Sequence, residues 1–248
     1  MASKLLPAAC FSLISCCASA APLDLHLDFN DNLLPAGWSI RPGPLNRNSN
    51  YGVAGGRYFA GEVDSSSFLS LPYAPSAGVT SLQVDWQGSV FQTYWGNNEG
   101  VNVVDAAGNA FLTRTESNDY LYGTGIRTFI GADAAPVYEL RPLPAGDYDF
   151  SAVFSNGQIA YTGSLAGTVM FSMTQRLQGF SVANLRAIEL VVYETTGPDS
   201  WIDNVHIVEQ ASAVPELASL PAMLLGLMGL GCVGLHRTRQ ASQGAAAG

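Results

Sequence analysis

The sequence predicts an all-β domain built as a two-sheet antiparallel sandwich. Apolar and polar residues alternate along short segments, turn-forming residues separate these segments, and helical periodicity is almost absent between residues 21 and 213. About ten to twelve short strands at this spacing, without helix-sized stretches, are typical of a sandwich.

The strands are recognised by apolar side chains at every second position. Leu23, Leu25, Leu27 and Phe29 alternate with polar residues, as in a strand with one buried face. Similar sets are Leu82, Val84 and Trp86; Tyr148, Phe150, Ala152 and Phe154; and Val169, Phe171 and Met173, with further strands expected at 101–104, 111–114 and 188–193. Turn signals such as Ala107-Gly108-Asn109 separate them.

Composition limits both the size of the fold and its partners. The 248 residues, 48% of them hydrophobic and 12% charged, allow one sizeable domain with short appendages. Between residues 24 and 209 there are eight arginines, no lysine and nineteen acidic residues, so the net charge is 8 − 19 = −11. Such a surface disfavours nucleic acid and anionic lipid, whereas neutral glycans or divalent cations fit it.

Residues 1–20 have the layout of a secretory signal peptide. Lys4 precedes an apolar run that ends in Ala18-Ser19-Ala20, the small-residue pattern of a cleavage site. Two alternatives are a short buried helix of a cytosolic fold and a lipoprotein signal in which Cys16 is acylated. We expect residues 21–212 to form the exported domain.

An uncharged apolar segment near the other end predicts a transmembrane helix at 217–235. Nineteen helical residues span roughly 28 Å, close to the thickness of the bilayer core. The basic residues that follow at once favour a cytoplasmic location for residues 240–248 and an outward-facing domain.

Val214, Pro215 and Glu216 stand directly before this apolar segment, and Arg237 and Arg239 follow it. In this order the residues at 213–239 resemble the PEP-CTERM sorting domain. The resemblance implies recognition by an exosortase, a membrane protease, in bacteria that export polysaccharide. It also implies transient anchoring in the inner membrane before release to the envelope or extracellular matrix. The segment departs from the family at Leu217, where a second proline is usual, and an ordinary uncleaved anchor is the alternative.

The four cysteines all lie outside the domain. They are Cys10, Cys16, Cys17 and Cys232. We therefore expect the domain to fold without disulfides and to depend on its apolar core.

Two segments favour the jelly-roll form of the sandwich. Residues 27–31 with 34–38 resemble the first strand of carbohydrate-binding-module jelly rolls, and 200–207 resemble their last strand. The resemblance implies that the first and last strands lie side by side, so that the two ends of the domain meet.

A calcium site is expected between these terminal strands. Asp203 shares the alternation of Trp201, Val205 and Ile207 and should point toward the core, where a carboxylate needs a partner. Asp28, Asn30 and Asp31 supply further oxygen ligands of the kind that calcium prefers. The alternative is a solvated strand end with Asp203 accepting backbone hydrogen bonds.

The ligand-binding candidate is a loop with two adjacent aromatic residues. Tyr94 and Trp95 can stack on sugar rings, and the amides of Asn97 and Asn98 can bind hydroxyl groups. A packed loop without a ligand is the alternative interpretation.

The domain has few of the residues that common catalytic mechanisms require, and we expect no catalytic residue. It contains two histidines, His26 and His206, no cysteine, and no nucleophile-elbow or zinc-helix motif. The favoured function is a non-catalytic module that binds extracellular polysaccharide. The alternatives are a glycan-active hydrolase or lyase with a dispersed site and a structural coat protein without a small ligand.

Overall fold

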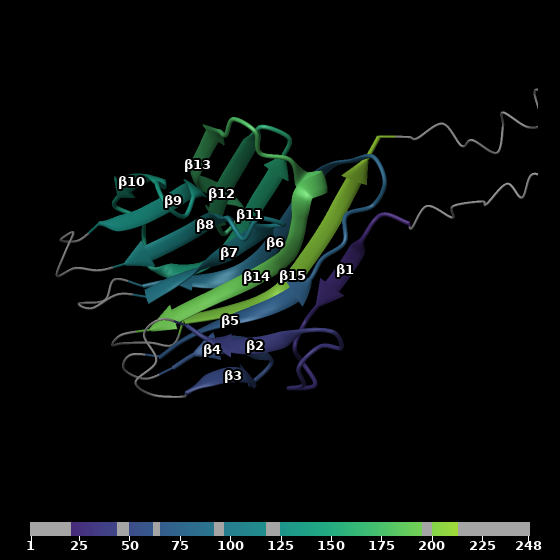
Figure 1. Ribbon diagram of the computed structural model, residues 1–248. Helices are drawn as coiled ribbons and strands as arrows, with labels where there is room; N and C mark the ends of the chain where they lie inside the picture. The colour runs from purple at the N-terminus through teal and green to yellow at the C-terminus, as the bar shows by residue number, and fades with distance from the viewer. Residues whose placement is uncertain are drawn as a thin grey trace, which may run out of the picture. The chain divides into compact units, whose positions relative to one another are not determined.

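The computed structural model describes residues 21–43, 50–61, 65–91, 97–117, 125–194 and 200–212, with only the backbone at Asn97 and Glu194. These residues form two antiparallel sheets that face each other, as Figure 1 shows. In sheet A the order is β13 (Thr168–Arg176), β12 (Gln158–Leu165), β11 (Gly146–Ser155), β6 (Val79–Val90), β15 (Ser200–Ala211), β4 (Arg57–Ala60) and β3 (Tyr51–Ala54), and β1 (Asp24–Leu27) also pairs with β15. In sheet B the order is β10 (Val137–Arg141), β9 (Ile126–Ala132), β8 (Ala110–Ser117), β7 (Asn97–Asp105), β14 (Leu185–Glu194), β5 (Ser65–Pro72) and β2 (Ser39–Pro42).

The predicted alternation defines the core between the two sheets. Leu82, Val84 and Trp86 of β6 are buried, and so are the inward residues of β11. The Trp86 ring stacks at 5.3 Å from Phe150 and 5.8 Å from Tyr161, measured between ring centroids. Each such ring removes a large apolar area from water, so this aromatic cluster is a main source of the stability of the domain.

The prediction of an all-β sandwich is confirmed. The strands expected at 101–104, 111–114 and 188–193 lie within β7, β8 and β14. In the part of the chain that the structure describes, the one helical element is the short 3₁₀ turn η1 (Val182–Asn184).

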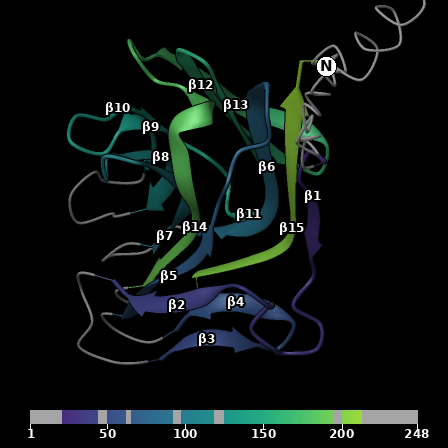
Figure 2. The same ribbon diagram turned by 45° about the vertical axis from the view of Figure 1, so that its right-hand side comes forward.

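The first and last strands are neighbours, as the jelly-roll resemblance implied. Asp24 of β1 is the Cα partner of Val208 in β15, and the pairing continues to Leu27 and Val205. Figure 2 shows β1 running beside β15 at the edge of the sheet. The two ends of the described domain therefore meet at one end of this strand pair.

A β-bulge in β15 changes which side chains face the core. The register with β6 shifts between Asp203 and His206, and Asn204 lies in the left-handed region at φ 47°. Ile202 and Val205 both belong to the core. In a regular strand, two residues three positions apart would face opposite sides of the sheet. Asp203 and Trp201 therefore lie on the outer face of sheet A. The expectation that Asp203 points toward the core was wrong, because strict alternation does not continue through a bulge.

Within the described residues, no helix is both long and apolar enough to cross a membrane. The predicted signal peptide at 1–20, the sorting tail at 213–239 and its helix at 217–235 lie outside the described residues.

Candidate functional site

The predicted aromatic loop lies mostly outside the described residues. Tyr94 and Trp95 are not described, and Asn97 is described only as the first backbone position of β7. The backbone carbonyl of Asn98 accepts a hydrogen bond from Ser200 Oγ at 3.0 Å. Its side-chain oxygen is buried without a hydrogen-bond partner among the described residues. Binding by this loop stays a prediction.

The predicted calcium ligands lie near the end of β1. Asp28, Asn30 and Asp31 are exposed. Asp28 Oδ1 accepts a bond from the Asn30 backbone N–H at 3.3 Å, and Asp31 Oδ1 accepts one from Leu33 at 2.9 Å. Both carboxylates thus stabilise the local turn by a common Asx pattern.

Asp203 lies on the outer face, near one positive and one negative side chain, Arg57 and Asp28. Partial burial raises the pKa of Asp203, and the neighbouring Asp28 carboxylate acts in the same direction. The backbone N–H of Asn204 and the Arg57 guanidinium oppose that rise. Among the described His, Cys, Asp and Glu residues, the one group of three with ligand atoms within 4.8 Å of one another lies elsewhere, at the pairing of β1 with β15. Calcium at Asp203 therefore also stays a prediction.

Polar side chains form two adjacent rows on the outer face of sheet A. The strand register sets them side by side, because Asp203 pairs with Gln87, Gln87 with Asp149, and Asp149 with Ser164. A second row one step along runs from His206 through Asp85 to Ser151 and Thr162. We name this surface the polar face, with members Gln83, Asp85, Gln87, Asp149, Ser151, Thr162, Ser164, Asp203, Asn204 and His206.

Hydrogen bonds within β6 and between neighbouring strands fix the amides of the polar face. Gln87 Nε2 donates to Asp149 Oδ1 at 2.9 Å, while Gln87 Oε1 accepts from Asn204 Nδ2 at 2.7 Å. Gln83 Nε2 donates to both oxygens of Asp85, at 3.0 and 2.9 Å. These bonds hold exposed donors and acceptors in defined positions, so a ligand with several hydroxyl groups would not have to order them.

An aromatic pair borders the polar face. Trp201 of β15 and Phe59 of β4 are cross-strand partners, and the Arg57 guanidinium lies 3.8 Å from the centre of the Trp201 ring. The indole is 6% exposed, whereas Arg57 above it is exposed. A cleft of about 340 Å³ opens here, lined by Ala54, Gly55, Arg57, Phe59 and Trp201. Aromatic faces beside amides are the chemistry that suits a sugar ring.

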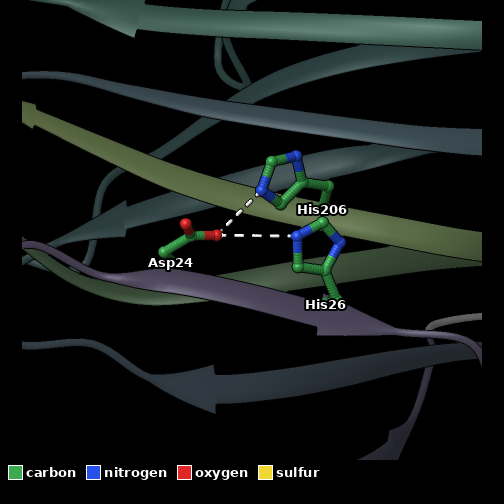
Figure 3. Close-up of side chains that lie close together, drawn as sticks. All are labelled: Asp24, His26 and His206. Atoms are coloured by element: carbon green, nitrogen blue, oxygen red, sulfur yellow. Dashed lines mark hydrogen bonds and ion pairs between the residues drawn. The ribbon is translucent and has the colours of Figure 1, made fainter.

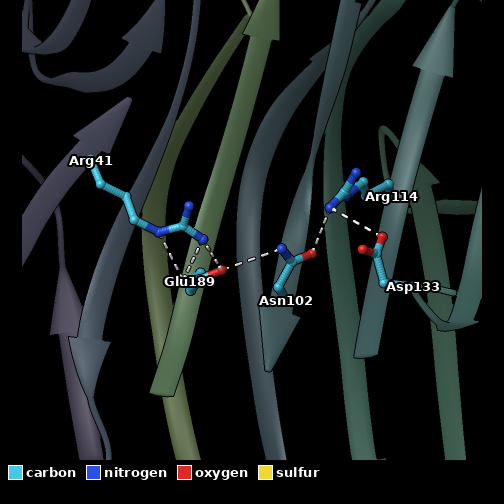
Figure 4. A network of polar contacts seen from close by, with 5 residues as sticks. All are labelled: Arg41, Asn102, Arg114, Asp133 and Glu189. Carbon is cyan, nitrogen blue, oxygen red and sulfur yellow. Dashed lines mark hydrogen bonds and ion pairs between the residues drawn. The ribbon is translucent and has the colours of Figure 1, made fainter. Parts of the chain in front are cut away.

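On the outer face of sheet B, the polar side chains form a network of contacts with one another. Figure 4 shows Glu189 held by Arg41, whose Nη2 lies 2.8 Å from Oε1, with Asn102 Nδ2 at 3.4 Å from Oε2. Asn102 Oδ1 in turn accepts a bond from Arg114 Nη2 at 3.1 Å, and Arg114 lies 3.9 Å from Asp133. Asn102 and Glu189 are buried in this network. These contacts bond the buried carboxylate and amide to each other and to the two guanidinium groups, which indicates a structural role, although Arg114 Nε is buried without a hydrogen-bond partner among the described residues.

Glu99, which follows the predicted aromatic loop, lies between the sheets. It is 1% exposed, and its Oε2 accepts a bond from the Ser89 backbone N–H at 3.0 Å. Gly88 leaves room for the carboxyl group, since a Cβ there would lie 2.8 Å from Oε1. Burial raises the pKa of Glu99 well above its usual value. Burial therefore favours the neutral form of this carboxyl group, which belongs to the interior rather than to either outer face.

An apolar cleft of about 500 Å³ lies beside the start of β1. It is lined by Ala21, Leu23, Leu25, Leu27, Pro35, Ala36, Trp38, Leu71, Pro72, Tyr73, Ala74, Ser76 and Glu209. Burial acts to raise the pKa of Glu209, but bonds from Ser76, Tyr73 and the Leu23 backbone outweigh it and lower that pKa. Glu209 thus anchors the segment before β1 to the last strand.

No protein-family profile and no curated protein matches the sequence. Solved structures match the fold. The CBM2 module of the evolved Dit protein from Lactobacillus casei BL23 phage J-1 superposes with a TM-score of 0.58 at 13% identity, covering 79% of this chain and all of that one. Peanut lectin gives 0.52 at 8% identity, over 79% and 100% of the two chains. A Bauhinia forficata lectin gives 0.50 at 6%, over 77% and 99%. The domain is therefore a jelly-roll sandwich, as predicted.

Sequence reasoning did not single out the polar face, although part of its signal was present. Gln83, Asp85 and Gln87 occupy the positions between the inward residues of β6, so an outward polar row could have been read from the alternation. The pairing of Trp201 with Phe59 depends on a register between strands far apart in the sequence, which periodicity does not supply.

Proposed function

We propose that this protein binds a neutral glycan on the polar face of sheet A, without catalysis. The observation that carries the proposal is the row of hydrogen-bonded, exposed amides and carboxylates that ends at Trp201 and Phe59. In the complex, a sugar ring takes the place of the Arg57 guanidinium over the indole. Its hydroxyl groups bind Gln87, Asp149 and Asn204.

Charge and fold both support this ligand class. The excess of nineteen acidic residues over eight arginines between residues 24 and 209 repels polyanions and leaves neutral polysaccharide as the compatible polymer. Solved structures that share the fold include a carbohydrate-binding module and two lectins, one of which is in complex with GalNAc.

A glycan array followed by a turnover assay tests the proposal. The full-length protein should retain at least one neutral polysaccharide and release no new reducing ends or unsaturated products from it. Turnover would instead support the hydrolase or lyase alternative. Absence of any bound glycan would contradict the proposal and favour a structural coat protein.

We further propose that the protein is exported and sorted by an exosortase. The proposal is supported by the signal-peptide layout of residues 1–20 and by the order of Val214-Pro215-Glu216, the apolar segment and Arg237. Mature protein from the native host should end near Glu216. Mass spectra in which the dominant extracellular form retains Arg237 would contradict sorting by cleavage.

A structural calcium ion at Asp28, Asn30, Asp31 and Asp203 is the last part of the proposal. The proximity of Asp28 to Asp203 supports it, because a dication would relieve the repulsion between the two carboxylates. At a hundredfold excess over Kd, calcium should add about 2.7 kcal/mol to the free energy of unfolding. Asp203→Asn should reduce this gain. Equal melting temperatures in calcium and in chelator would contradict the site.

A further inference from the structure

The pairing of the first and last strands brings together three side chains that can ligate a metal. His26 of β1 is the Cα partner of His206 in β15, and Asp24 lies two positions before His26 on the same face of the strand. Figure 3 shows both imidazole rings turned toward the Asp24 carboxylate. Asp24 lies 182 positions before His206 in the sequence, and the pairing of the first strand with the last brings the two together.

The geometry of the group is convergent. The two imidazole rings stack with their centroids 3.8 Å apart and their planes inclined by 11°. His206 Nε2 lies 2.9 Å from Asp24 Oδ1, and His26 Nε2 lies 3.7 Å from the same oxygen. One ligand atom from each residue lies within 4.8 Å of the other two. Two nitrogens and one oxygen thus surround a single point on the outer edge of sheet A.

We propose that Asp24, His26 and His206 form a binding site for a divalent transition-metal ion of the zinc class. Imidazole nitrogen suits zinc, copper and nickel, whereas calcium takes oxygen ligands, so two histidines select against calcium here. Ligand bonds of about 2.0 to 2.2 Å require the three groups to close around the ion. Their side chains are 68%, 73% and 32% exposed, in the order Asp24, His26 and His206, so the ion can enter from solvent.

The ion would replace the proton that joins His206 to Asp24 and leave a fourth position for water. Its structural effect follows from the place of β1 in the sheet. In the described part of the chain this four-residue strand pairs with β15 alone. A metal bonded to both strands therefore cross-links the start of the domain to its last strand and closes a loop of nearly the whole chain. His206 is also a member of the polar face, but the residues proposed to bind the sugar there are Gln87, Asp149, Asn204 and Trp201, so zinc binding can be tested without a glycan.

Titration of metal-free full-length protein with zinc chloride, followed by calorimetry and thermal unfolding, tests the site. We expect one zinc ion to bind through these residues and to raise the melting temperature by about 5 °C at a hundredfold excess over Kd. Asp203→Asn should keep the full zinc-dependent shift while its calcium-dependent shift is reduced, which separates this site from the predicted oxygen site. His26→Gln and His206→Gln should each weaken zinc binding at least about tenfold and abolish the thermal shift.

His236→Gln is the matched control, because His236 is the third histidine of the chain and lies outside the described residues. It should keep both the affinity and the thermal shift. The four cysteines outside the domain can also bind zinc, so the difference between variants decides the result. Zinc binding and thermal shift that are unchanged in both His26→Gln and His206→Gln would overturn the proposal, and so would the absence of any zinc-dependent shift in the native sequence.

Discussion

The two outer faces of the sandwich contain similar polar residues but use them in opposite ways. On sheet B, Glu189 and Asn102 are buried in a chain of ion pairs and amide contacts with Arg41 and Arg114. On sheet A, Gln87 and Asn204 are exposed, and their hydrogen bonds orient them without covering them. The aromatic rings differ in another way, since the largely buried Trp201 lines a cleft on sheet A, whereas Tyr138 of β10 is 54% exposed and lies under Arg127 outside the clefts described above.

This contrast separates polar residues that stabilise the fold from those that can serve a ligand. Removing one member of a buried network lowers the free energy of unfolding strongly, because the charge that remains is shielded from water and has lost its partner. Removing one member of an exposed network changes the free energy of unfolding little, because water replaces the missing partner. Substitutions on sheet B should therefore lower stability, and matched substitutions on sheet A should lower binding.

The largest expected effect on stability is at Glu189. Glu189→Ala leaves Arg41 and Asn102 without their shared partner and should lower the free energy of unfolding by about 3 kcal/mol. The value is at the low end for a buried pair because the Arg41 side chain is 52% exposed and can be rehydrated. Urea denaturation measures it.

Glu139→Ala is the control for this prediction. Its ion pair with Arg141 lies on the surface, so its loss should cost at most about 1 kcal/mol. Equal costs for Glu139→Ala and Glu189→Ala would remove the distinction between buried and exposed networks on sheet B.

The interior carboxyl group gives a pH-dependent test that involves neither outer face. The pKa of Glu99 is raised in the folded state, so folding favours its neutral form, and stability should fall as the pH rises above the ordinary value of 4.5. Glu99→Gln keeps an acceptor for the Ser89 N–H and has no charge to lose. The variant should be more stable than the native protein at pH 7, and the difference should shrink toward zero below pH 4.5. A constant difference across this range, measured by urea denaturation, would contradict a neutral Glu99.

The smallest expected effect is at the exposed aromatic residue of sheet B. Tyr138→Ala removes a cation–π contact in which the Arg127 guanidinium lies 4.2 Å from the ring centre. The loss should be about 0.5 to 1 kcal/mol in the free energy of unfolding, with no change in glycan affinity. A loss of glycan affinity would place the binding surface on sheet B instead.

The sequence predicted the sandwich because its strands bury alternate residues, a pattern that Leu82, Val84 and Trp86 show without any knowledge of their partners. It also predicted the pairing of the first and last strands, through the resemblance of residues 27–31 and 200–207 to jelly-roll strands. It misplaced Asp203, because the bulge at Asn204 reverses the alternation and no local residue pattern announced it.

The proximity of His26 to His206 illustrates the remaining limit on sequence-based prediction. Both histidines lie within the segments predicted as the first and last strands, and the adjacency of those strands was also expected. Their exact opposition depends on the register, and a slip of one residue would turn one imidazole to the other face. Register between distant strands is set by the packing of the whole sheet, so side-chain clusters of this kind emerge only from the folded structure.

The central claim is that sheet A carries a glycan-binding surface that ends at Trp201. Isothermal titration of full-length protein with the best neutral glycan from the array, comparing Trp201→Ala with Tyr138→Ala and Trp95→Ala, tests it most directly. Loss of a stacking ring of this kind should cost about 1 to 3 kcal/mol of binding free energy, which is roughly a 5-fold to 150-fold loss of affinity. We predict this loss for Trp201→Ala and native affinity for Tyr138→Ala, with both variants folded by circular dichroism. Native affinity in Trp201→Ala, together with a loss in Trp95→Ala, would contradict the claim and assign the site to the aromatic loop.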